Sequence, residues 1–175
     1  MRWTPLLAAP AAVIVTVPAH AAVYFTTEQA QQKMFPGATF THVPVQLSDA
    51  DRRTMYDRSG VHEPFDARRI WRASTGGWFV IDEVVGKHEH IKYAVAIGTN
   101  GAVRDMEIME YNESYGYEVR EASWRQQFVG KTASSPLKLG SDIKYVSGAT
   151  LSSKHLTGGV KRVLVMYELA LKGRQ

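Results

Sequence analysis

The hydrophobic and polar positions along the chain predict both strands and helices. Every second residue from Ile91 to Ile97 is large and apolar, and the residues between are small or polar, a pattern typical of a half-buried strand. Asn100-Gly101 follows as a strong hairpin signal, so residues 103–111 are expected to return antiparallel. The same kind of pattern predicts further strands over residues 39–47, 67–73 and 78–85.

Helical patterns lie on both sides of these strands. Thr26 begins a capping-box pattern, and Ser48-Asp49-Ala50-Asp51 is expected to cap a second helix. The two helices are expected to end near residues 35 and 59. Residues 118–129 are also expected to be helical. The last helix has one apolar face, made of Leu156, Val160, Val163, Leu164, Tyr167 and Leu171. We therefore predict one α+β domain, an antiparallel sheet packed by flanking helices, with a long C-terminal helix.

The pair Gly158-Gly159 falls within this last helical pattern. Each glycine costs a helix about 1 kcal/mol relative to alanine. Two interpretations stay open. Either another backbone or a flat ligand approaches the helix closely at these glycines, or the helix begins only after Gly159.

The first 21 residues have the pattern of a secretory signal peptide. Met1-Arg2 gives a positive start, an uncharged apolar stretch follows, and Ala19-His20-Ala21 matches the A-x-A cleavage site. Three prolines and a length at the lower limit for a bilayer argue against a retained anchor. We expect cleavage before Ala22, with residues 22–175 as one exported domain that is periplasmic or otherwise extracytoplasmic, in solution or at the membrane surface.

Composition restricts the chemistry that this chain can perform. The sequence contains 0 cysteines, which excludes disulfides, iron–sulfur clusters, thiolate nucleophiles and thioether-linked haem. The net charge is only +4, and the basic residues are scattered rather than gathered on one face. We therefore do not expect nucleic-acid binding.

Small residues and hydroxyls gather where the last helix is expected to begin, in the segment Ser147-Gly148-Ala149-Thr150. Free backbone N–H groups at a helix start favour a phosphate. Gly148 allows a tight turn, and Ala149 keeps bulk away from Thr150. A phosphate-bearing ligand suits this segment, although a plain strand–turn–helix junction capped by Ser or Thr has the same composition.

These four residues resemble the [Ser/Thr]-Gly-Ala-Thr signature of the FMN-binding domain family, which includes the flavin-carrying subunits of the Rnf complex and the sodium-pumping quinone reductase. The resemblance spans most of the chain after the signal peptide, at about residues 24–171. It implies that Thr150 carries FMN through a phosphoester, installed from FAD by a flavin transferase, and that Ser147, Gly148 and Ala149 shape the phosphate turn. Glu113-Ser114-Tyr115-Gly116 is similar to a Glu-Thr-x-Gly loop that lies close to the flavin in this family.

The chain departs from the family in front of the signature, where the usual Asp is replaced by Lys144 and the nearest acid is Asp142. Lys144 either weakens recognition by the transferase or places a positive charge near the phosphate. A flavin ring also needs apolar or aromatic walls. The candidates are Tyr111, Tyr115, Tyr117, Trp124 and Tyr145, and Glu113 is a candidate acceptor for a flavin N–H.

The sequence thus favours an exported flavoprotein that relays electrons in an extracytoplasmic or membrane-associated redox chain, with a redox partner protein still to be identified. A single tethered FMN indicates a relay rather than a complete enzyme, so we assign no catalytic residue. One alternative is a non-redox binding or assembly module in which Ser147–Thr150 is only a capped turn. Another is a zinc site at His88 and His90, with Glu110 or His62 as third ligand. Neither HExxH nor cysteine supports zinc, so we assign no metal ligand.

Overall fold

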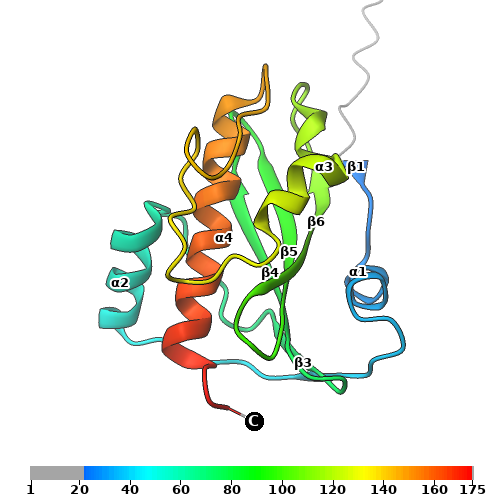
Figure 1. Ribbon diagram of the computed structural model, residues 1–175, viewed down its shortest axis with the longest axis vertical. Helices are drawn as coiled ribbons and strands as arrows, with labels where there is room; N and C mark the ends of the chain where they lie inside the picture. The colour runs from blue at the N-terminus through cyan, green and yellow to red at the C-terminus, as the bar shows by residue number, and fades with distance from the viewer. Residues whose placement is uncertain (1–21, 175) are drawn as a thin grey trace, which may run out of the picture.

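The computed structural model describes residues 22–174, and the predicted signal peptide, residues 1–21, lies outside the described residues. Its centre is an antiparallel six-stranded sheet in the order β1-β6-β5-β4-β3-β2, with helices packed against it (Figure 1). The prediction of a single α+β domain with a long C-terminal helix is confirmed. The strands are β1 (Ala22–Val23), β2 (Phe40–His42), β3 (Ile70–Ala73), β4 (Trp78–Val85), β5 (His90–Ile97) and β6 (Val103–Tyr111).

The predicted β5–β6 hairpin is confirmed, since Ile97 pairs with Val103 across the Asn100-Gly101 turn. The strand predicted over residues 39–47 is shorter than expected, because β2 has only three residues. Pro44 lies just beyond β2, at the edge of the sheet, where a residue without an N–H is tolerated. Val43 and Val45 on either side of it still donate backbone hydrogen bonds toward β3, to the carbonyls of Ile70 and Ala67.

The α-helices are α1 (Thr27–Met34), α2 (Asp49–Ser59), α3 (Ala122–Arg125) and α4 (Thr150–Ala170). The predicted capping box is present at Thr26, and the predicted cap at Ser48 also forms a capping box, with Asp51. The helix predicted over residues 118–129 is wrong in detail, because this segment divides into η1 (Tyr117–Arg120), α3 and η2 (Gln126–Phe128). Val119 and Trp124 are both buried, and five residues apart they would lie on different sides of one regular helix.

Strand β5 is buried on both faces, so the prediction of a half-buried strand is wrong. Its large residues contribute to the core beneath α4, and this core includes Leu156, Val160 and Val163 of the helix. Ala94 and Ala96 face the other side, where α1 supplies Ala30 and Met34 to a second core. The alanine side chains are small enough to let α1 pack closely over this face. None of the helices within residues 22–174 is both long enough and apolar enough to cross a bilayer.

Helix α4 begins at Thr150, so Gly158 and Gly159 lie inside it and the alternative of a later start is wrong. Both glycines serve close packing within the protein. A Cβ atom on Gly158 would lie 2.9 Å from the carbonyl oxygen of Ser59, at the end of α2. A Cβ atom on Gly159 would lie 2.2 Å from the hydroxyl of Tyr93. Close approach of another backbone, one of the two interpretations, is thus confirmed at Gly158.

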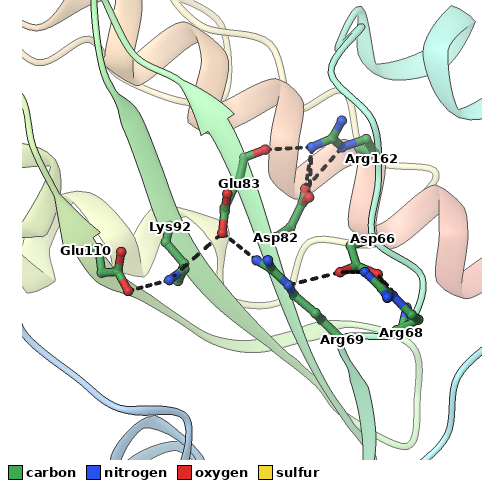
Figure 2. A network of polar contacts seen from close by, with 8 residues as sticks. All are labelled: Asp66, Arg68, Arg69, Asp82, Glu83, Lys92, Glu110 and Arg162. Atoms are coloured by element: carbon green, nitrogen blue, oxygen red, sulfur yellow. Dashed lines mark hydrogen bonds and ion pairs between the residues drawn. The ribbon is translucent and has the colours of Figure 1, made fainter.

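A buried ion pair joins α4 to the sheet beside these glycines. The Nη2 atom of Arg162 lies 2.8 Å from Oδ1 of Asp82 on β4, and its Nε lies 3.1 Å from Oδ2. Tyr93 donates its hydroxyl hydrogen to the same carboxylate. Figure 2 shows this pair beside a row of alternating charges that crosses the sheet through Arg69, Glu83, Lys92 and Glu110. The buried pair therefore joins the middle of α4 directly to β4.

Candidate cofactor-binding site

A cavity of about 630 Å³ opens at the start of α4. Three segments meet there: the turn between β4 and β5, the loop after β6, and the first turn of α4 (Figure 1). This volume lies within the usual range for small-ligand sites, roughly 300–1,000 Å³. The residues that line the cavity are Lys87, His88, Glu89, Asn112, Glu113, Ser114, Tyr115, Gly148, Ala149, Thr150, Leu151 and Ser152.

The start of α4 presents free donors to this cavity. Its N-cap residue is Ala149, and no side chain within the described residues makes a cap hydrogen bond there. The first N–H groups of a helix have no acceptor inside the helix, and they carry the positive end of the helix dipole. Thr150 is the first helical residue, and it is exposed. The arrangement therefore offers a hydroxyl and unpaired N–H groups to an anionic ligand, which a side-chain cap would have blocked.

Ser153 holds the turn in front of α4 and leaves the first N–H groups of the helix free. Its hydroxyl donates to the carbonyl of Ala149 at 2.8 Å and accepts from the N–H of Val146 at 3.2 Å. This buried serine fastens the turn to the helix from inside, away from the cavity. Gly148 has a φ of 78°, in the left-handed region, as expected of a tight turn.

The two sequence segments of the predicted site are packed directly together. A Cβ atom on Gly116 would lie 2.3 Å from the Cβ of Ala149 and 2.9 Å from the hydroxyl of Tyr111. The loop after β6 can therefore lie against the 147–150 turn only because both facing residues are small. Gly116 itself does not line the cavity; it sets the distance between two of the cavity's walls.

Glu113 is held by the protein itself. One of its carboxylate oxygens accepts hydrogen bonds from the backbone N–H groups of Lys87, His88 and Glu89, and the side chain is buried. Burial acts to raise the pKa of Glu113, but the three N–H groups outweigh it and hold the pKa below its usual value. Glu113 is therefore a buried carboxylate and not a solvated one, and one of its two oxygens is already engaged by the protein.

The predicted aromatic walls are distributed between two places. Tyr115 lines the cavity and is 78% exposed. Tyr111 is buried, donates its hydroxyl hydrogen to the Tyr115 carbonyl at 2.6 Å, and packs against the tilted ring of Tyr117. Trp124 and Tyr145 instead line a second hollow of about 540 Å³, together with Ser147 and Lys144. Of the five aromatic candidates, Tyr115 alone lines the main cavity.

The carboxylate of Asp142 has a structural role in a turn. Its carboxylate accepts from the backbone N–H groups of Leu137 and Lys138 and from the ammonium of Lys131, 2.9 Å away. Burial acts to raise its pKa, but these donors hold the pKa of Asp142 below its usual value. Asp142 therefore closes a turn and does not replace the acid that is missing at Lys144.

The residues considered as zinc ligands do not form a metal site. His88 lies in the turn that precedes β5, whereas His90 is the first residue of that strand. Glu110 pairs with Lys92, and His62 packs on Tyr56 with 3.9 Å between ring centroids. Within residues 22–174, no group of three or more His, Asp or Glu side chains is arranged to hold a metal ion.

Sequence reasoning missed the Gly86–Glu89 turn as part of this site. These residues lie between two predicted strands, and their contact with Glu113 joins residues far apart in the chain. Asn112 and Leu151 also line the cavity without having been predicted. Their positions beside the two recognised segments were the available signal.

The fold and the cavity define an α+β domain with a ligand site at the uncapped start of a long helix, the kind of site that suits a phosphate-bearing ligand. Residues 86–165 match the FMN-binding domain, so this part of the chain is similar to that family. The match includes every residue that lines the cavity. FMN is therefore the cofactor, and the resemblance noted in the sequence is confirmed.

A relative from Acetobacterium woodii extends the comparison beyond the domain. The chain is 25% identical over 158 residues to a subunit of the Na⁺-translocating ferredoxin:NAD⁺ oxidoreductase complex of that organism. The similarity covers 82% of this chain and 74% of that protein. It therefore includes elements of the sheet that precede the matched domain.

Proposed function

We propose that this protein is an exported electron carrier with FMN attached to Thr150 through a phosphoester. The observation that carries the proposal is the uncapped start of α4, which presents the Thr150 hydroxyl and free N–H groups to a cavity of about 630 Å³. A phosphate ester at this position would be stabilised by the helix N-terminus. A bound flavin supplies the transfer of one or two electrons.

The attachment requires a partner enzyme, an FAD:protein FMN transferase. The Thr150 oxygen would form a bond to the phosphorus of the FMN half of FAD. The bond from that phosphorus to the bridging pyrophosphate oxygen breaks, AMP leaves, and the hydroxyl proton is released. Because Thr150 is exposed at the cavity mouth, its oxygen is accessible to such an enzyme. A covalent tether keeps the effective concentration of flavin high at the site, which is useful where lost cofactor is hard to replace.

Different residues around the cavity would contact different parts of the cofactor. The first turn of α4 would hold the phosphate, and Gly148 and Ala149 shape that turn. Ser114 and Tyr115 line the wall after β6 and are available to the remainder of the cofactor. Ser147 faces the second hollow, where Lys144 and Trp124 also lie, and this surface is accessible to a protein that recognises the signature.

A redox partner protein follows from the same proposal. The relative in Acetobacterium woodii is a subunit of an oxidoreductase complex, which supports a relay between other redox proteins. We place the protein outside the cytoplasm, after removal of residues 1–21, in solution or at the membrane surface. The chain would then act as an electron carrier rather than as a complete enzyme.

The test is the intact mass of the full chain after co-expression with the transferase. The protein should gain the mass of one FMN minus one water. Thr150→Val keeps the shape of the side chain but removes the hydroxyl, so it should abolish the gain. Ser114→Ala removes another hydroxyl from the same cavity and should leave the gain intact. Protein of unmodified mass isolated from its native host would contradict the proposal.

A second comparison addresses Lys144. Lys144→Asp restores the residue that the family signature usually has at this position. A mass gain in this variant but not in the parent chain would assign the failure to transferase recognition in a foreign host. A mass gain in both would show that Lys144 is compatible with attachment.

A further inference from the structure

The Gly86–Glu89 turn is fixed from two sides at the edge of the cavity. We propose that this turn is a wall of the flavin site, one that the recognised motifs do not include, and that Glu113 and His155 are positioning residues that hold it. The inference rests on the proposed attachment of FMN at Thr150. It concerns which residues the cofactor meets beyond its phosphate.

The N–H side of the turn is fixed by Glu113. The N–H of His88 lies 2.6 Å from Oε1 of Glu113, that of Glu89 lies 3.1 Å away, and that of Lys87 donates to the same oxygen. Gly86 makes this possible, because a Cβ atom there would lie 2.5 Å from that oxygen. Three converging donors leave the backbone of the turn little freedom to move away from the loop after β6.

The carbonyl side is fixed by His155 of α4. Its Nδ1 lies 2.5 Å from the carbonyl oxygen of Val85 and 3.1 Å from that of Gly86. Both neighbours are acceptors, so Nδ1 carries a hydrogen and donates it. His155 stands just over one helical turn beyond Thr150, and the residue that orients the turn is thus on the same helix as the anchor.

Glu113 and His155 bind only the backbone of the turn, so the side chains of the turn remain available to a ligand. Lys87, His88 and Glu89 are exposed, and all three line the cavity into which Thr150 opens. A phosphate held at the helix start leaves the rest of FMN inside a space bounded by the loop after β6 and by this turn. The turn is therefore positioned to contact the part of the cofactor beyond the phosphate.

The lack of cysteine in the chain provides a direct test. His88→Cys introduces a unique thiol on the turn, and Arg53→Cys places one on an exposed part of α2, away from the cavity. Maleimide labelling of the full chain is compared with and without flavin on Thr150, with intact mass as the measure of loading. We expect flavin to slow labelling at residue 88 at least tenfold and to leave labelling at residue 53 unchanged.

Equal labelling at residue 88 in loaded and unloaded protein would overturn the proposal that the turn is a wall of the site. A chain that acquires no flavin at Thr150 would instead contradict the proposed function. The mass measurement distinguishes these two failures, since the first is defined only for protein with flavin attached.

The positioning roles are tested without flavin. Hydrogen–deuterium exchange of residues 86–90 should be at least tenfold faster in His155→Leu and in Glu113→Ala than in the parent chain. His155→Asn keeps a donor close to the position of Nδ1, so it should restore slow exchange. If Glu113→Ala does not fold, Gly86→Ala tests the same contact, because its Cβ would displace the Glu113 carboxylate. Unchanged exchange in the folded variants would show that neither residue holds the turn.

Discussion

Gly116 and Ala149 lie so close together that a Cβ atom on the glycine would be 2.3 Å from the Cβ of the alanine. The contact joins the loop after β6 to the turn that begins α4, and both segments border the cavity. It gives a physical reason for two positions of the sequence motifs. Glycine is needed in one segment and a side chain no larger than alanine in the other, because the two backbones pack against each other.

Gly116→Ala should separate these segments and destabilise the protein. A left-handed backbone costs alanine about 1–2 kcal/mol, and the overlap with Ala149 adds to this cost. Gly130→Ala is the matched control, since Gly130 has a φ of 81° but no atom lies within 4 Å of the position that a Cβ would take there. Urea denaturation should show a larger loss for Gly116→Ala. Equal losses would mean that backbone conformation alone explains the glycine.

The buried pair of Arg162 and Asp82 should matter far more than the exposed charges beside it. Arg162→Leu leaves a buried carboxylate without its partner, which typically costs about 3–5 kcal/mol. Arg68→Leu breaks an ion pair with Asp66 whose arginine is 81% exposed, and such pairs contribute about 0–1 kcal/mol. Chemical denaturation of the two variants checks the contrast. A loss below about 1 kcal/mol for Arg162→Leu would contradict it.

Gly159→Ala should have two opposite effects on stability, one from helix propensity and one from packing. Alanine favours the helix by about 1 kcal/mol, but its Cβ would meet the Tyr93 hydroxyl at 2.2 Å and Val84 at 2.9 Å. We expect a net loss of stability. The loss should be smaller when the substitution is made in a Tyr93→Phe background, where the nearest atom is absent. A double-mutant cycle measures this coupling, and strictly additive effects would show that the hydroxyl does not determine the glycine.

The parts of the fold that the sequence predicted depend on local interactions. The capping boxes at Thr26 and Ser48 and the Asn100-Gly101 turn each involve residues within a few positions of one another. The burial of both faces of β5 was not predictable in this way. It depends on α1 packing over Ala94 and Ala96 from more than fifty residues away.

In the candidate site, too, the residues that share a local sequence pattern were predicted, whereas those that depend on contacts across the fold were not. The hydroxyl and small residues at 147–150 are contiguous, so their pattern was visible in the sequence. The roles of Glu113 and His155 arise from contacts with the 85–89 segment across the fold, and neither residue has a local signal for them. Ser147 was expected beside the ligand because it is adjacent in sequence, but the turn directs it toward the second hollow.

The charge on Glu113 should make the stability of the protein depend on pH in a defined direction. Its folded pKa is depressed, so its contribution is fully present above the unfolded pKa of about 4.3 and is lost as pH falls through the folded pKa. Glu113→Gln retains an acceptor but loses the charge, and hydrogen bonds to charged groups are worth about 1.5–3 kcal/mol against about 1 for neutral ones. The substitution should therefore reduce the free energy of unfolding near pH 7.

This difference between the parent chain and Glu113→Gln should narrow as pH is lowered below about 4.3 and vanish below the folded pKa. Urea denaturation at a series of pH values between neutral and acidic conditions measures it. Glu89→Gln is the control, because Glu89 is an exposed carboxylate in the very turn that Glu113 holds. A difference for Glu113→Gln that stayed constant across the series would show that the shape of the side chain, and not its charge, fixes the turn.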